Sequence, residues 1–273
     1  MALGPRLVET WCMTTIAQGV RSAETEDLRF IKQWLAREAE GNRGFIHNWP
    51  MIQEAQNEGH MLVFEATEGV VGFLTYGISR SSILQIKSDH VRHGIGRALV
   101  EHAIANEVAE GNPIQVVQCE PKSSAGFWRR MGFRYYRQRN NGPEENNVYM
   151  YHVSELQHPN TDTTEDLSVT ILVYPSAALY RRGEVIPDQV HYAMAEYNSQ
   201  DDTLLLDHRI CVVDEDVLED AVLEVRVLGS TWLFEKAKRD SAFELGFKGC
   251  KNHNGWYIDA IRRPTSPVEL QTA

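Results

Sequence analysis

The stretch that decides the fold is Ile83-Leu-Gln-Ile-Lys-Ser-Asp-His-Val-Arg-His-Gly-Ile-Gly-Arg-Ala-Leu99. Its first residues are typical of a short strand, and residues 94–110 have the apolar spacing of a long helix. Glycine lets the backbone approach a ligand closely, and the first N–H groups of a helix point outward at the positive end of its dipole. The stretch therefore predicts an anion site suited to a pyrophosphate.

A G-x-G pair alone is weak evidence, so the surrounding elements matter. A dinucleotide-binding turn of the Rossmann type requires a third glycine where Leu99 stands, and a short strand–helix–strand start. This sequence has neither feature. Apolar periodicity and turn residues instead predict two helices, at about 24–40 and 49–59, between a strand at 15–23 and later strands. The other predicted elements are strands at 60–67, 70–79, 82–88, 114–119, 133–139 and 147–153 and helices at 94–110 and 123–131.

A second motif follows one strand later, at residues 123–133. It reads Ser-Ser-Ala-Gly-Phe-Trp-Arg-Arg-Met-Gly-Phe and resembles the helix ending in F-Y/W-x-x-x-G-F of the GNAT superfamily of N-acetyltransferases. The segment around the two glycines is similar to that family's Q/R-x-x-G-x-G/A motif. The resemblance covers about half of the chain. It implies an α/β (α+β) fold with a mixed sheet, acetyl-CoA as cosubstrate, and transfer of the acetyl group to an amine.

The resemblance also implies which residues hold the cosubstrate. Main-chain groups of Ile86 and Ser88, on a strand expected to splay from its neighbour, would bond the pantetheine arm. Phe127 and Trp128 would flank that arm or the thioester, and Ser123 or its neighbour would bond near it. The pyrophosphate would lie on the amides of Arg92, His93, Gly94, Ile95, Gly96 and Arg97.

The catalytic groups are less clear, because two positions depart from the family pattern. Val91 stands where the motif's leading Gln or Arg would contact phosphate, and Trp128 stands where many members use a tyrosine to protonate the departing thiolate. An indole N–H donates a hydrogen bond but is not a practical acid. Glu120 is the best-placed carboxylate for a general base, with capping of the next helix as its alternative role. His90 and Cys119 are weaker candidates, with a solvated loop residue and a buried apolar residue as their alternatives.

The charge is unevenly distributed along the 273 residues, whose net charge is -11. Residues 1–155 carry 16 basic against 18 acidic side chains, and residues 156–273 carry 11 against 20. This acidic balance disfavours nucleic acid as a partner, including tRNA as an acceptor, and favours a cationic substrate. Acidic surfaces that only keep the protein soluble are the alternative explanation.

Two absences in the sequence bear on the compartment. No apolar run approaches the roughly 20 residues of a membrane span, so we expect no membrane association. The four cysteines have no CxxC spacing, which argues against disulfides and a zinc site and favours a cytoplasmic location. We expect no metal.

Residues 15–155 are thus predicted to form a GNAT-like acetyltransferase domain, followed by a polar linker at 156–165. Residues 166–273 are predicted to form a second, smaller α+β domain, with strands at 169–174, 203–213 and 256–261 and helices at 188–197, 217–222 and 235–245. We expect an N-acetyltransferase acting on a small-molecule or peptide amine. The alternative is a catalytically idle acyl-CoA-binding sensor or scaffold. The second domain would shape acceptor choice or make a subunit contact, so a homodimer stays open.

Overall fold

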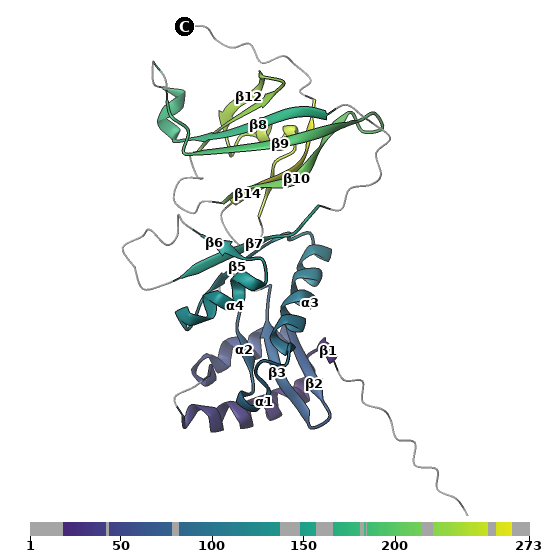
Figure 1. Ribbon diagram of the computed structural model, residues 1–273, viewed down its shortest axis with the longest axis vertical. Coiled ribbons are helices and arrows are strands. Elements are labelled where there is room, and N and C mark those ends of the chain that lie inside the picture. Colours follow the sequence, from purple (N-terminus) through teal and green to yellow (C-terminus); the bar gives the residue numbers. More distant parts are fainter. Residues whose placement is uncertain are drawn as a thin grey trace, which may run out of the picture. The chain divides into compact units, whose positions relative to one another are not determined.

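The computed structural model describes residues 19–41, 44–77, 82–136, 148–156, 166–180, 183, 185–213, 221–250 and 255–263 (Figure 1). The chain divides into two compact units, Met1–Tyr76 with Ile83–His102 and Gly77–Ser82 with Ala103–Ala273. The expected linker lies outside the described residues except for its first residue, Leu156. The domain boundaries at 155 and 166 therefore stay a prediction.

The first unit is built on a four-stranded antiparallel sheet of order β1-β2-β3-β4. Helices α1 and α2 and the 3-10 turn η1 lie between β1 and β2 in the chain, and the helices contact β2 and β3. The apolar face predicted for the first helix, Leu28, Ile31, Trp34 and Leu35, is buried. The bounds are β1 (Gly19–Ser22), α1 (Thr25–Ala39), η1 (Ile46–Asn48), α2 (Trp49–Asn57), β2 (Met61–Ala66), β3 (Gly69–Thr75) and β4 (Leu84–Ile86).

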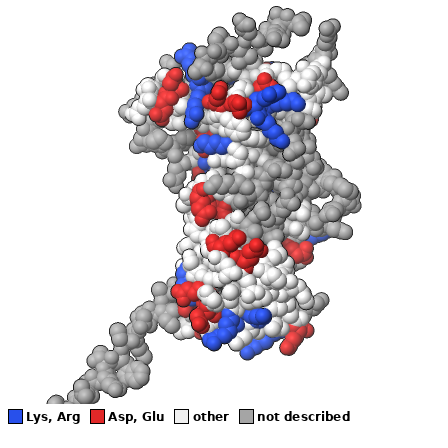
Figure 2. Space-filling view, turned by 180° about the vertical axis from the view of Figure 1, so that it is seen from behind, with Lys and Arg blue, Asp and Glu red and all other residues white. Residues whose placement is uncertain are grey.

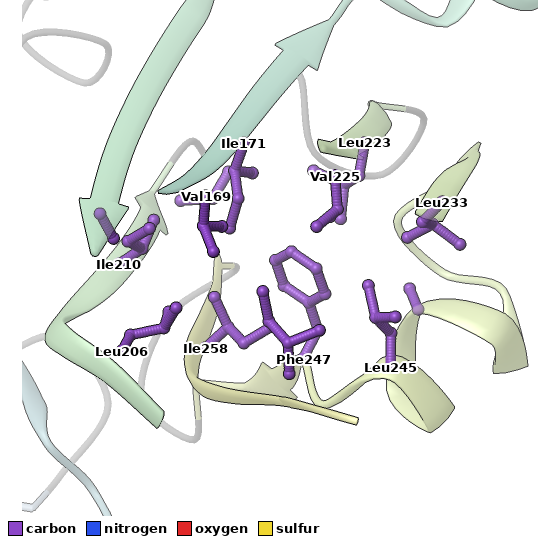
Figure 3. Packing of buried hydrophobic residues seen from close by; sticks show 14 of the residues in the cluster. Val169, Ile171, Leu206, Ile210, Leu223, Val225, Leu233, Leu245, Phe247 and Ile258 are labelled. Carbon is purple, nitrogen blue, oxygen red and sulfur yellow. The ribbon is translucent and has the colours of Figure 1, made fainter. Parts of the chain in front are cut away.

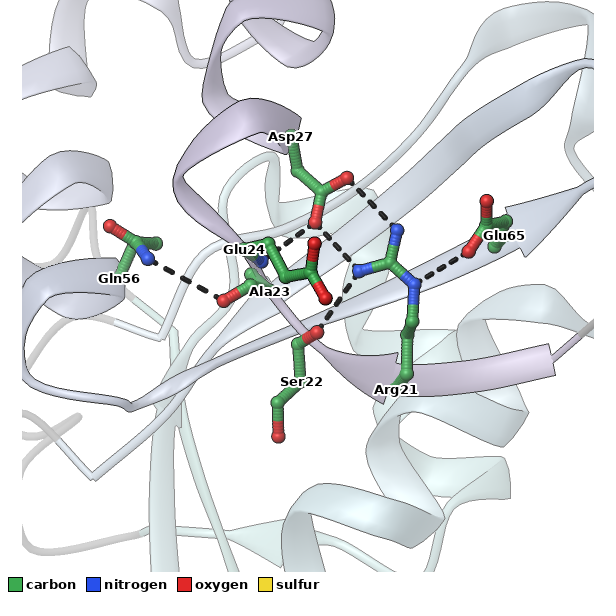
Figure 4. Close-up of polar contacts among 7 residues, drawn as sticks. All are labelled: Arg21, Ser22, Ala23, Glu24, Asp27, Gln56 and Glu65. Atoms are coloured by element: carbon green, nitrogen blue, oxygen red, sulfur yellow. Dashed lines mark hydrogen bonds and ion pairs between the residues drawn. The ribbon is translucent and has the colours of Figure 1, made fainter.

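Arg21 fixes β1 against the start of α1 (Figure 4). Its guanidinium donates to both carboxylate oxygens of Asp27, from Nη1 at 2.7 Å and Nη2 at 3.0 Å, and Nε donates to Glu65 at 2.5 Å. Asp27 also accepts the main-chain N–H of Glu24, which precedes the helix. The hydrogen bond to Asp27 raises the pKa of Arg21. The network satisfies a donor at the helix start and joins β1, α1 and β2.

The second unit contains the end of α3 (Ile95–Ala109), a helix that starts in the first unit. A small antiparallel sheet of order β5-β7-β6 follows, with helix α4 between β5 and β6 in the chain. This order agrees with the order predicted from periodicity. The bounds are β5 (Ile114–Gln118), η3 (Lys122–Ser124), α4 (Ala125–Arg130), β6 (Arg134–Tyr135) and β7 (Tyr149–Val153).

The rest of the second unit is a seven-stranded antiparallel sheet of order β12-β11-β8-β9-β10-β14-β13. One of its faces packs on the short helix α6, and Phe247, only 2% exposed, lies at the centre of that core (Figure 3). This region is thus sheet-rich, and its status as a separate domain stays a prediction. The bounds are β8 (Asp166–Tyr174), η4 (Ser176–Leu179), β9 (Gln189–Asn198), β10 (Thr203–Val213), β11 (Val222–Val227), β12 (Ser230–Lys236), α6 (Asp240–Leu245), β13 (Lys248–Gly249) and β14 (Gly255–Arg262).

The helix predicted at 188–197 is wrong, because the structure has strand β9 there. Alanine, methionine and glutamate favour helices, but Ala193 and Ala195 are buried while Tyr192 and Met194 are exposed. That alternation has the period of a strand, and pairing with β8 and β10 overrides the weak helical preference. The predicted helix at 235–245 begins only at Asp240, and most of the one predicted at 217–222 lies outside the described residues.

Candidate functional site

Strand β4 presents main-chain groups at an open edge. Lys87 N donates to Val71 O at 2.9 Å and Thr75 N donates to Ile83 O at 3.0 Å, so residues 83 and 87 direct their groups towards β3. Because successive residues of a strand alternate between its two edges, the N–H and C=O of Ile86 point away from β3. Among the described strands β4 pairs only with β3. Such main-chain groups need partners, and a ligand can supply them.

The turn after β4, residues 92–97, has a backbone suited to binding an anion, and we call it the cradle. Arg92 has φ 67° and Gly94 has φ 83°, both left-handed, and such turns let successive N–H groups point to one side. Ala98 N donates to Gly94 O at 3.0 Å, which is the first bond of α3. The amides of residues 95–97 therefore have no acceptor within the helix. A Cβ added at Gly94 would meet no atom within 4 Å, so the space beside this residue is open.

A buried glutamine joins β4 to the segment between α1 and α2. Gln85 is 8% exposed; its Oε1 accepts from Phe45 N at 2.9 Å and its Nε2 donates to Glu38 Oε2 at 2.7 Å. The other oxygen of Glu38 accepts Ser88 N at 2.7 Å. A Cβ on Gly44 would lie 2.3 Å from Gln85 Nε2, and the φ of Gly44 is +84°, so both the contact and the backbone favour glycine here. We did not predict this cluster, although a polar residue inside an apolar strand is a recognisable signal.

His90 braces the segment before the cradle. Its Nδ1 lies 2.7 Å from Asp89 Oδ1, and its Nε2 contacts Glu68 Oε1 in the turn between β2 and β3. The hydrogen bond to Asp89 raises the pKa of His90, with the contact to Glu68 acting in the same direction. Lys87 Nζ lies 3.3 Å from Asp89 as well. Because both ring nitrogens are engaged by carboxylates, His90 suits a structural contact better than a general base.

A family model described as an acetyltransferase (GNAT) domain matches residues 57–135, which include β4, the cradle and α4. The chain contains a GNAT domain. No curated protein matches the chain.

Solved structures with similar chains cover about half of this one. A ribosomal-protein-alanine N-acetyltransferase from Brucella melitensis is 20% identical, with a TM-score of 0.39, over 49% of this chain and 98% of its own. A Mycobacterium tuberculosis protein solved in complex with CoA is also 20% identical, with a TM-score of 0.37, and covers 49% and 98%. An acetyltransferase of the GNAT family from Bacillus cereus is 15% identical, with a TM-score of 0.40, over 52% and 99%.

Acetyl-CoA is the cosubstrate of a GNAT domain, and the residues present fit it. The free amides at the start of α3 suit a pyrophosphate, and the open edge at Ile86 suits the amides of a pantetheine arm. The amide of Ser88 already donates to Glu38, so its carbonyl is the group left for a ligand. Which residues contact the cosubstrate stays a prediction.

Helix α4 places its two aromatic residues differently. Phe127 is half-buried, whereas Trp128 is 6% exposed and packs edge-on against Phe127 and Phe133, at centroid distances of 5.2 and 5.0 Å. Trp128 is therefore part of the apolar packing under the small sheet. Ser123, at the start of the same segment, is exposed. Of the two aromatic residues, Phe127 is the one with surface left to contact a ligand.

The two candidate groups at the end of β5 also differ. Burial raises the pKa of the Cys119 thiol, which is 1% exposed, so Cys119 suits the apolar role. Glu120 is exposed, and the following turn begins at Pro121 without a side-chain cap. The capping role is therefore not observed. Glu120 belongs to the second unit and the cradle to the first, so its role as a general base stays a prediction.

The described residues give little to suggest other classes of site in this domain. They contain no group of three or more His, Cys, Asp or Glu side chains that could hold a metal ion. Within the same residues no helix is long and apolar enough to span a membrane. On the face drawn in Figure 2, basic and acidic side chains are interspersed and no broad basic surface is visible among the described residues.

Proposed function

We propose that the GNAT domain transfers the acetyl group of acetyl-CoA directly to a primary amine of a small molecule or peptide. The observation that carries the proposal is the open main-chain edge at Ile86 followed by the free amides at the start of α3. The amides of residues 95–97 hold the pyrophosphate. Main-chain N–H groups at the edge of β4 polarise the thioester carbonyl, as in an oxyanion site.

Glu120 serves as the general base in this proposal. The amine attacks only as a neutral nucleophile, so the carboxylate removes its proton, directly or through one water. The nitrogen–carbon bond forms as the carbon–sulfur bond breaks, and the sulfur leaves as a thiolate. A free thiol has a pKa of about 8.5, so a thiolate is a stable leaving group near neutral pH. A dedicated acid is therefore not required, which fits a buried Trp128 in place of a tyrosine.

The first test is calorimetric titration of the full chain with acetyl-CoA, and the absence of binding would refute the proposal. The second is release of the CoA thiol in the presence of polyamines, aminoglycosides and lysine-rich peptides. For the accepted amine, Glu120→Gln should lower kcat/KM by about 10²–10⁴-fold at neutral pH. The exposed Glu244 on α6 provides the matched control, and Glu244→Gln should leave kcat/KM unchanged.

A catalytically idle acyl-CoA sensor or scaffold is the second candidate. The burial of Trp128 favours it, because an indole is not a practical acid and this side chain has little exposed surface. The sensor would bind acetyl-CoA in the calorimeter and release no thiol above the uncatalysed rate with any amine of the panel. Turnover of one amine above that rate excludes it.

A further inference from the structure

The seven-stranded sheet carries a cavity of about 540 Å³ on the face opposite its core. Ile171, Leu223 and Val225 point into the core in Figure 3, and residues along a strand alternate between faces. Their neighbours on β8 and β11 therefore face the other side, and these residues line the cavity. The lining residues are Leu172, Tyr174, Ala178, Gly183, Val185, Pro187, Glu224, Arg226, Thr231 and Phe234.

A buried carboxylate lies in this lining. Glu224 is 7% exposed and accepts four hydrogen bonds: from Arg226 Nε at 2.7 Å and Nη2 at 3.0 Å, from Thr231 Oγ1 at 3.0 Å and from Tyr174 OH at 2.8 Å. A carboxylate has about four lone-pair sites, so Glu224 has none left for a ligand. Its charge is also balanced by Arg226. A cationic ligand would find neither a free acceptor nor a free negative charge at this carboxylate.

Arg226, in contrast, has N–H donors that Glu224 does not use. Its Nε and one N–H of Nη2 are used by Glu224, whereas Nη1 has no hydrogen-bond partner within the described part of the chain. The side chain is 42% exposed, and the bidentate pair with Glu224 holds its orientation. The free edge, formed by Nη1 and the second N–H of Nη2, has the geometry that binds a carboxylate through two parallel hydrogen bonds.

The rest of the lining is apolar and aromatic. Leu172, Tyr174 and Ala178 form a buried cluster with Val222, against which Val185 and Phe234 pack. The rings of Tyr174 and Phe234 meet edge to face, with centroids 6.1 Å apart. The cavity volume falls within the range of about 300–1,000 Å³ typical of small-molecule sites, which combine apolar walls with a few fixed polar groups.

We propose that this pocket binds a small amphipathic carboxylate. The carboxylate pairs with the free edge of Arg226, and an alkyl or aryl body lies against Leu172, Val185 and Phe234. A single negative charge fits better than a phosphate dianion, because Glu224 lies beside the same guanidinium and repels additional charge. The site is distinct from the acetyl-CoA cradle and does not depend on acetyl transfer.

The test is calorimetric titration of the full chain with octanoate and phenylacetate, and with the corresponding amides and amines. We expect the carboxylates to bind at least about tenfold more tightly than the amides, because hydrogen bonds between charged groups are the stronger ones. The amines should bind more weakly still. Amides that bind as well as the carboxylates, amines that bind better, or no binding of either carboxylate at millimolar concentration would each overturn the proposal.

Two variants locate the site. Arg226→Gln should reduce carboxylate affinity at least tenfold, but it also leaves Glu224 unpaired and could impair folding. Ala178→Phe fills the cavity from its wall and keeps the whole polar network, so it should abolish binding in a folded protein. Arg239→Gln changes an exposed arginine before α6 and is the matched control, with unchanged affinity expected. Carboxylate binding that persists in Ala178→Phe would overturn the assignment to this pocket.

Discussion

Replacing Gly94 by alanine tests the anion cradle without removing any side chain. An added Cβ would meet no atom within 4 Å, so the substitution causes no clash. Its only energetic cost is that of holding an alanine at φ 83°. A residue with a Cβ loses about 1–2 kcal/mol in the left-handed conformation. If the turn relieves this strain by leaving its binding conformation, the apparent Kd for CoA rises by the same free energy, about 5- to 30-fold.

Gly59 offers a matched control in the same unit, after the end of α2. Its φ is 79°, and a Cβ there would also meet nothing within 4 Å. Gly59→Ala and Gly94→Ala should therefore lower the melting temperature by similar amounts. Only Gly94→Ala should weaken CoA binding in calorimetry. S-acetylpantetheine, which lacks the pyrophosphate, should bind both variants and the wild type equally.

Three results would refute this reasoning. Gly94→Ala could bind CoA as tightly as the wild type, which would mean that the pyrophosphate does not lie on this turn. Gly59→Ala could lose as much affinity, which would make the effect one of general stability. S-acetylpantetheine could be affected as strongly as CoA, which would place the contact at the pantetheine arm.

Three further predictions concern stability and protonation. Gly246 has φ +126°, and a Cβ added there would lie 2.2 Å from a main-chain oxygen. Gly246→Ala should therefore lower the free energy of unfolding in urea by roughly 2–4 kcal/mol. The control is Gly229→Ala, whose added Cβ meets no atom within 4 Å and which should cost about 1–2 kcal/mol. Equal costs would contradict the clash. Arg209 donates to both carboxylate oxygens of Asp259, at 2.6 and 3.1 Å, and its side chain is 10% exposed. Arg209→Ala should therefore lower the free energy of unfolding by about 3 kcal/mol. A loss of less than about 1 kcal/mol would show that water replaces the ion pair. The pKa of His90 is raised in the folded protein. Its contribution to stability is therefore complete below the unfolded pKa of about 6.5 and is lost as the pH rises through the folded pKa. An NMR titration of His90 with a midpoint at or below about 6.5 would be inconsistent with the carboxylate contacts.

The cradle could be predicted from the sequence because it is made by consecutive residues. The strand, the turn and the start of α3 follow one another between residues 83 and 99, and their backbone requirements appear as apolar spacing and glycine positions. The open edge of β4 then follows from the pairing with β3. A polar Gln85 inside an apolar strand is a signal in the sequence, but its partner Glu38 could not be predicted, since the two are 47 residues apart and meet only when α1 packs on the sheet.

Strand β9 shows a second limit of prediction from sequence, namely that local preference can indicate the wrong secondary structure. Its residues 193–196, Ala-Met-Ala-Glu, favour a helix when they are considered locally. The structure makes them a strand, because β8 and β10 supply hydrogen bonds to both edges and the core accepts Ala193 and Ala195. Both partners lie outside the segment, on the strands before and after it in the chain, so the helix preference of residues 193–196 alone does not contain the information.

By itself the sequence determined the order of elements in the first half of the chain, the glycine turn and the family to which that half is similar. These features depend on short-range rules, namely which residues tolerate a positive φ and which spacing buries one face of a helix. Tertiary structure alone decided that Trp128 is buried, that Glu224 is saturated and that Arg226 keeps a free edge. Burial and hydrogen-bond partners depend on strand register and packing between distant segments, which fix where each side chain's charge and donors end up.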